Sequence, residues 1–262
     1  MLLVWTRGAQ RASSEGQRGF ALHTLVAVLL SSLVLALTGG VAVAGSPGAK
    51  GGAAEMRVAA SVASVASVAS APTAARHRMK VVVIVGPVSG ETHRYISMAK
   101  RLAARARSYG ATVIELYSPR ATWARVRAAA TGANLLIYLG HGNGSPSPYA
   151  GGQDSHNGLG LNASASGSNS NVKYYGETYV ARSIRLAKNA VVILNHLCYA
   201  SGNSEWGRGN PRKSVAMQRV DNYGEGFLRA GAAAVFAEGI TDPGYIIDNL
   251  FRTSRTMSQI SE

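Results

Sequence analysis

Five short apolar runs, separated by amphipathic segments, constrain the fold of this chain more than any other feature. Each run is nearly continuous in Val, Ile, Leu or Ala, as expected of a strand buried on both faces of a sheet. The predicted strands span residues 79–88, 111–117, 133–140, 190–197 and 232–238. Helices are predicted at 91–109, 122–130, 175–186, 215–230 and from 243 to the chain end. This alternation predicts an α/β domain with a mostly parallel sheet of five or six strands and helices on both faces.

We expect the flavodoxin-like strand order 2-1-3-4-5, numbered along the chain, with the first predicted strand between the second and the third. In such sheets, ligands bind outside the C-terminal ends of the strands. Two long polar loops leave those ends, at 141–174 and 201–214. Long loops in compact domains are usually functional, so the site is expected between them.

Composition sets the outer limits on function. Apolar residues make up 47% of the 262 residues, enough for a substantial core. Lys and Arg number 27 against 13 Asp and Glu, but the excess is spread along the chain, and no nucleic-acid-binding module is present. We therefore predict no specific nucleic-acid partner, and composition says nothing of the oligomeric state. A single cysteine excludes an intramolecular disulfide framework and multi-cysteine metal sites.

The N-terminus has the layout of a secretory signal peptide. Arg7, Arg11 and Arg18 precede an uncharged apolar run from 20 to 44, which ends in the small-residue site Ala42-Val43-Ala44. We predict cleavage after Ala44, with a retained membrane anchor as the alternative. The mature protein would then be secreted or at the cell surface, without membrane contact.

The remaining chain divides into a linker and one folded domain. Residues 45–78 are a low-complexity Ala/Ser/Val linker that includes SVASVASVAS, and residues 79–262 form the α/β domain. Small residues bury too little area to offset the entropy of ordering such a segment.

Two predicted strands end next to residues that can carry nucleophilic chemistry. The third runs into Gly140-His141-Gly142, and the fourth into Asn195-His196-Leu197-Cys198. Since neighbouring parallel strands lie about 4.8 Å apart, groups just beyond their ends can approach closely. A cysteine needs a nearby base to become a thiolate, and histidine is that base near neutral pH. Glycine beside His141 leaves backbone N–H groups accessible as oxyanion donors.

These segments resemble the caspase-fold cysteine peptidases, which include caspases, metacaspases, legumains and gingipains. The matching residues are LLIYLGHG and VVILNHLC, with 57 residues from His141 to Cys198. The resemblance covers residues 79 to about 251. It implies a caspase-like fold and an endopeptidase with Cys198 as nucleophile, His141 as general base, and the backbone N–H groups of Gly142 and Cys198 as oxyanion hole. A closer resemblance, in GHGNG and HLCYASGNSE, is to uncharacterised bacterial exported proteins, for which it supplies a fold and no reaction.

The chain departs from the family pattern around the cysteine. Leu197 stands where a small residue is usual, and the Gln-Ala-Cys-x-Gly signature is absent. Asn195 and His196 are candidate accessory residues. Asp154, Glu205 and Asp242 are candidates for setting substrate specificity, and the expected partner is a peptide or protein substrate.

Three other interpretations remain open. His141, His156, His196 and Cys198 could ligate zinc, but they lack the tight clustering of structural sites, so we predict no metal. Gly140, Gly142 and Gly144 suggest a phosphate loop, yet neither GxGxxG nor GxxxxGK[ST] is present, and we predict no cofactor. The third is a catalytically inactive caspase-fold module that acts in surface adhesion.

Overall fold

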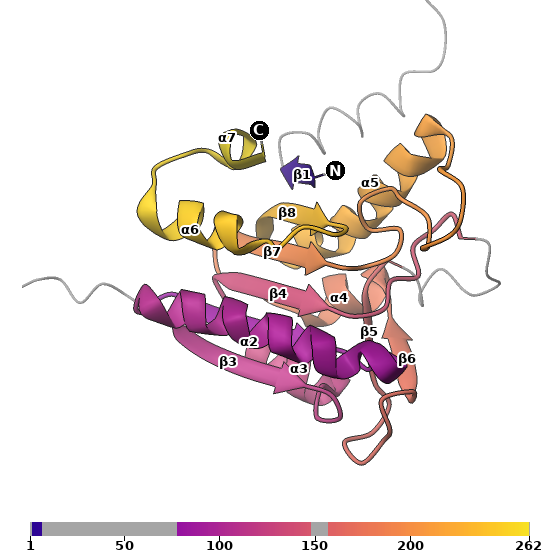
Figure 1. Cartoon of the computed structure of the whole chain (residues 1–262). Coiled ribbons are helices and arrows are strands. Elements are labelled where there is room, and N and C mark those ends of the chain that lie inside the picture. The colour runs from indigo at the N-terminus through magenta and orange to yellow at the C-terminus, as the bar shows by residue number, and fades with distance from the viewer. Residues whose placement is uncertain (1, 7–77, 148–156, 262) are drawn as a thin grey trace, which may run out of the picture. The chain divides into compact units, whose positions relative to one another are not determined.

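A six-stranded sheet forms the centre of the molecule (Figure 1). The computed structural model describes residues 2–6, 78–147 and 157–261, all of which belong to one compact unit. The strands are, in spatial order, β1 (Leu2–Thr6), β8 (Ala232–Glu238), β7 (Ala190–Asn195), β4 (Leu135–Leu139), β2 (Lys80–Val85) and β3 (Thr112–Tyr117).

The five strands predicted from the apolar runs are parallel and lie in the predicted order. β2 lies between β3 and β4, and β7 and β8 follow outward from β4. This confirms both the α/β class and the 2-1-3-4-5 order. Except at the exposed edge in β3, these strands are buried almost throughout, which explains their continuous apolar character.

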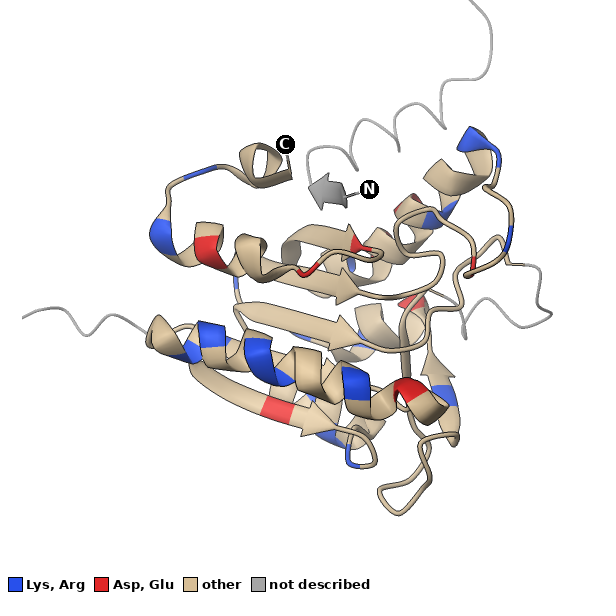
Figure 2. Ribbon diagram, viewed as in Figure 1, with Lys and Arg blue, Asp and Glu red and all other residues tan. Residues whose placement is uncertain are grey.

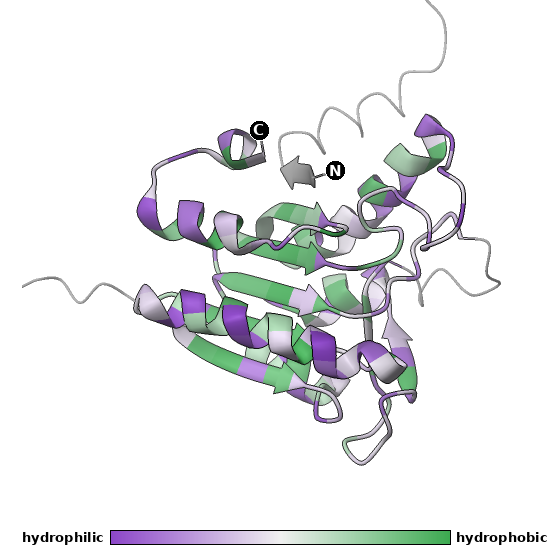
Figure 3. Cartoon of the chain, viewed as in Figure 1, coloured by the Kyte–Doolittle hydropathy of each residue, from purple (hydrophilic) through white to green (hydrophobic). Residues whose placement is uncertain are grey.

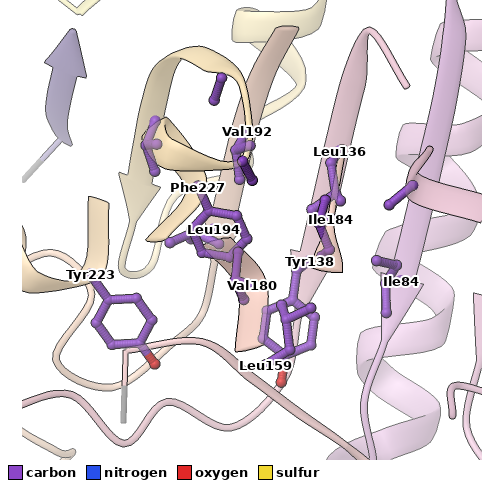
Figure 4. Close-up of a cluster of buried hydrophobic side chains, with 14 of the residues drawn as sticks. Ile84, Leu136, Tyr138, Leu159, Val180, Ile184, Val192, Leu194, Tyr223 and Phe227 are labelled. Carbon is purple, nitrogen blue, oxygen red and sulfur yellow. The ribbon is translucent and has the colours of Figure 1, made fainter. Parts of the chain in front are cut away.

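Helices cover both faces of the sheet, and a separate apolar cluster lies under each set. Figure 3 shows that the strands between the helices are largely hydrophobic. One face is covered by α3 (Trp123–Ala130), α4 (Glu177–Ser183) and α5 (Lys213–Arg229). Figure 4 shows the centre of this cluster, where Phe227 of α5 packs near Val192 and Leu194 of β7. The other face is covered by α2 (Thr92–Ser108), α6 (Gly244–Arg252) and α7 (Met257–Ser261).

Helix α2 illustrates how the sequence pattern specifies packing. Tyr95, Ala99, Leu102 and Ala106 recur every three or four residues, and all are buried against the sheet. The helix stops before Gly110, whose φ of 82° is left-handed and favours glycine. Lys and Arg residues recur along α2 and also occur in α5 (Figure 2).

The structure corrects three sequence expectations. The loop at 141–174 contains an antiparallel hairpin, β5 (Leu159–Asn162) and β6 (Val172–Tyr175), whose strands are too short to stand out as apolar runs. The helix expected at 175–186 starts two residues later, because β6 extends to Tyr175. The helix expected from 243 onward is interrupted at residues 253–256, between α6 and α7.

The structure also contains a strand at the N-terminus that we did not predict. Strand β1 pairs antiparallel with β8, although its residues belong to the segment predicted as a signal peptide. Residues 7–77, including the cleavage site and the linker, lie outside the described residues, so both stay predictions. Among the helices that the structure describes, none combines the length and hydropathy needed to cross a membrane.

Candidate active site

Cys198 and His141 follow the C-terminal ends of two neighbouring parallel strands. The last registered pair between β4 and β7 is Leu139 and Asn195. The same register, continued by three residues, sets Gly142 of the His141 loop opposite Cys198. The fold therefore brings together two short segments that are more than fifty residues apart in sequence.

The backbones of these segments remain in contact beyond the sheet. A Cβ atom placed on Gly142 would overlap the carbonyl oxygen of Cys198 and would lie 2.9 Å from its backbone nitrogen. Side-chain carbons are not found closer than 3.0 Å to such atoms. Position 142 therefore requires glycine, and the reason is the close approach of the Cys198 backbone rather than a turn.

Cys198 lies in a strained turn. His196 and Tyr199 on either side of it have left-handed φ values of 57° and 71°, which residues with a Cβ rarely adopt. The turn closes with a hydrogen bond from the Gly202 N–H to the Tyr199 carbonyl at 2.9 Å. Such strain persists only where the surroundings impose it and is concentrated at functional sites. The thiol is free and half-buried.

Burial moves the pKa values of thiol and imidazole away from each other. It raises the pKa of the Cys198 thiol, and the negative charge of Glu205 raises it further. Burial lowers the pKa of His141, and the charge of Glu205 opposes that shift. Near neutral pH the resting pair is therefore a thiol and a neutral imidazole, which can accept a proton.

Buried tyrosines anchor the His141 loop. The Tyr138 hydroxyl lies 2.9 Å from the Gly160 carbonyl and 3.1 Å from the His141 carbonyl, and it accepts a hydrogen bond from the Gly160 N–H at 2.9 Å. Further along, the Asn143 N–H donates to the Tyr223 hydroxyl at 3.2 Å. These bonds tie the loop to hairpin β5–β6 on one side and to α5 on the other.

Arg219 on α5 connects the loops that carry His141 and Cys198. Its guanidinium donates to the carbonyls of Pro146, at 2.8 Å, and Asn203, at 2.6 Å, and it lies over the Tyr199 ring at 4.5 Å. Only 7% of the residue is exposed. We did not predict this role from the sequence. The available signal was an arginine one helical turn before Tyr223, on the apolar stripe of α5.

A cavity of about 1230 Å³ opens beside Cys198. Its lining includes Cys198, His196 and Glu205 from the candidate residues, together with Tyr95 of α2. His141 is not part of this lining and instead approaches Gly160 of β5. The His196 ring lies 5.6 Å from the Tyr95 ring, and burial and the charge of Arg94 lower its pKa.

The other candidate residues have different surroundings. Asn195 is fully buried and donates to the carbonyls of Glu238, at 3.3 Å, and Thr241, at 3.0 Å, which fixes the end of β7. Glu205 accepts a hydrogen bond from the Tyr199 hydroxyl at 2.9 Å. Asp242 accepts one from the Gly244 N–H and is not part of the cavity lining. Asp154 lies outside the described residues.

The described side chains give no support for the zinc interpretation. Among them, no group of three or more His, Cys, Asp or Glu residues is arranged to hold a metal ion. His156, which that interpretation requires as a ligand, lies outside the described residues.

Comparisons with known proteins complete the description of the site. No protein-family model matches the chain, and no curated protein matches it. Among solved structures, the chain is similar to the Arg specific cysteine proteinase gingipain R, with 17% sequence identity and a TM-score of 0.40. The similarity covers 70% of this chain and 40% of that chain, so the chain spans less than half the length of gingipain R.

Proposed function

We propose that the protein is a cysteine peptidase that hydrolyses peptide bonds with Cys198 as nucleophile and His141 as general base. The observation that carries this proposal is the contact between the backbones of Gly142 and Cys198, beyond the ends of β4 and β7. It presents a thiol and an imidazole from adjacent chain segments at the ligand-binding edge of a parallel sheet. The resemblance of both strand-end segments to caspase-fold peptidases supports the same assignment.

The proposed reaction begins when His141 accepts the proton of the Cys198 thiol and the sulfur attacks the substrate carbonyl carbon. A C–S bond forms while the carbonyl π electrons move onto oxygen. The tetrahedral intermediate then collapses, the C–N bond breaks, and His141 gives its proton to the leaving amine. In the second half, His141 takes a proton from water, the hydroxide attacks the thioester, and the thiol is restored as the peptide acid leaves.

Two backbone N–H groups are available for the oxyanion. Among the described residues, the N–H of Gly142 donates to no partner, and the N–H of Cys198 contacts only its own thiol. Loss of one such donor costs about 3 kcal/mol of transition-state stabilisation in well-studied hydrolases. Together with the thiol, these groups supply the parts that acyl transfer needs.

The proposal is tested by mass spectrometry of a proteome-derived peptide library after incubation with the purified protein. We expect Cys198→Ala and His141→Ala to abolish cleavage. His93→Ala should cleave normally, because His93 is exposed on α2 and is not part of the cavity lining. Full cleavage by the Cys198→Ala protein would refute the proposal.

The alternative, an inactive binding module, is favoured by one observation. Burial raises the pKa of the Cys198 thiol, as it does for an unreactive structural cysteine. A peptidyl acyloxymethyl ketone distinguishes the two functions, because it alkylates activated thiols. Labelling of Cys198 that depends on His141 supports the peptidase, and equal slow labelling with and without His141 supports the module.

We also propose that the protein is exported and that its leader is removed after Ala44. The support is the sequence pattern of residues 1–44. Cleavage would take β1 away from β8 and leave β8 as an edge of the sheet. Intact-mass analysis of the product secreted by an expressing host is the test. We expect Gly45 as the first residue, whereas a secreted product starting at Met1 would contradict the prediction.

A further inference from the structure

Two large apolar residues that line the cavity containing Cys198 are mostly exposed. Trp206 is 97% exposed and Ile240 is 73% exposed. They come from different loops, Trp206 from the segment between β7 and α5 and Ile240 from the segment between β8 and α6. Both line the cavity that also contains Cys198. Exposed apolar side chains that gather at one site, rather than scatter singly, commonly mark a binding surface.

The charged groups of this cavity are balanced and largely engaged with the protein. Its acidic residues are Glu91 and Glu205, and its arginines are Arg94 and Arg208. Glu91 forms an ion pair with Arg94 at 2.5 Å, and Glu205 accepts the hydrogen bond from the Tyr199 hydroxyl. A substrate lysine or arginine would have to compete with these donors for either carboxylate. The cavity is therefore poorly suited to recognise a basic side chain by charge.

The cavity walls extend the apolar surface inward. Tyr95 and Leu197 belong to the lining and are buried, and Pro211 and Ala216 also line the cavity. The volume of about 1230 Å³ exceeds that of ordinary small-molecule sites, so several residues of an extended peptide fit. An indole offers a large rigid surface that loses little conformational entropy when it is covered.

We propose that this cavity selects peptide substrates by a large apolar side chain, which packs between Trp206 and Ile240 next to the scissile bond. This inference rests on the proposed peptidase function, since it assigns the substrate class of the same site. Trp206 and Ile240 are specificity-determining residues, and neither takes part in bond breaking. The driving force is removal of their apolar surface, and that of the substrate side chain, from water.

The test compares short peptides that differ at one position beside the scissile bond, carrying Phe, Leu, Ala, Asp or Arg. The wild-type protein should cleave the Phe and Leu peptides with kcat/KM about tenfold or more above the Ala peptide. Trp206→Ala and Ile240→Ala should each remove most of that preference, measured as the ratio of kcat/KM for the Phe peptide to kcat/KM for the Ala peptide. Met217→Ala is the matched control, because Met217 is 56% exposed but lies on α5 outside the cavity lining. It should retain the full preference.

Two outcomes overturn the inference while leaving the peptidase function intact. One is a wild-type preference for Arg or Asp. The other is an unchanged Phe-to-Ala ratio in both cavity variants. If the wild type cleaves none of the peptides, binding of the same peptides to the Cys198→Ala protein, measured by calorimetry, tests whether the cavity selects apolar side chains. Tighter binding of Phe and Leu peptides, lost in Cys198→Ala/Trp206→Ala, supports apolar selection although the peptidase function fails. Equal binding of all five peptides refutes the selection.

Discussion

Replacing Gly142 by alanine tests the backbone contact on which the candidate site depends. The new Cβ would overlap the Cys198 carbonyl oxygen, and relief to the 3.0 Å limit requires the two segments to separate by about 1 Å. The neighbour is backbone rather than a flexible side chain, so it cannot rotate away. Misplacement of catalytic groups by about 1 Å costs about a hundredfold in rate. We therefore expect Gly142→Ala to lower kcat/KM by about two orders of magnitude or more.

The assay pairs peptide cleavage with thermal unfolding, so that loss of activity can be separated from loss of fold. Gly90→Ala is the matched control, because a Cβ there meets no atom within 4 Å. That variant should keep its activity and its Tm. The reasoning is refuted if Gly142→Ala stays folded and retains kcat/KM within a few-fold of the wild type.

Four further predictions concern the loops, the titration and the core. Arg219→Ala should lower both Tm and kcat. Arg219→Lys should restore little of either, because one ammonium cannot replace contacts to both Pro146 and Asn203. Unchanged activity in either variant would contradict the proposed link between the loops. Burial lowers the pKa of His141, so the unprotonated base should persist to lower pH, and the acidic limb of kcat/KM should fall below the ordinary histidine value of about 6.5. Glu205→Gln removes a charge that raises the pKa of both groups, so both limbs should move to lower pH, and a shift to higher pH would exclude this arrangement. Phe227→Ala should cost about 3–5 kcal/mol in the free energy of unfolding, measured in urea, because the ring is fully buried beneath the sheet; a loss under about 1 kcal/mol would show that the core is packed differently.

The parallel sheet could be predicted because its strands are buried on both faces. Continuous apolar runs such as 81–85 and 135–139 fit poorly anywhere but in a strand covered on both faces. The right-handedness of parallel crossovers then allows few strand orders. Hairpin β5–β6 gives no such signal. A Cβ on Gly160 in β5 would come close to the Tyr174 ring and Val172, a crowding that only the folded chain reveals. Strand β1 was missed because its apolar residues also suit a leader.

The position of the candidate site could be predicted, but the contacts that support it could not. Cys198 and His141 each follow a buried strand, and the strand order brings the two segments together. A role for Arg219 could not be predicted, because a helical sequence pattern does not show whether an arginine is buried or exposed. Its burial depends on carbonyls at 146 and 203, in two loops that are far apart in sequence. The cavity wall formed by Trp206 and Ile240 is likewise contributed by separate loops.

The pairing of β4 with β7 also determines at which stage of folding the candidate site can form. Hairpin β5–β6 and helix α4 lie within the connection between these strands, and their local contacts can form early in folding. The β4–β7 contact must instead close a loop of about fifty residues, at an entropic cost that only the assembled sheet offsets. An unfolded chain thus carries a thiol without its base. On the proposed chemistry, Cys198 is unreactive until β4 and β7 pair, so the appearance of its reactivity reports the closure of the sheet.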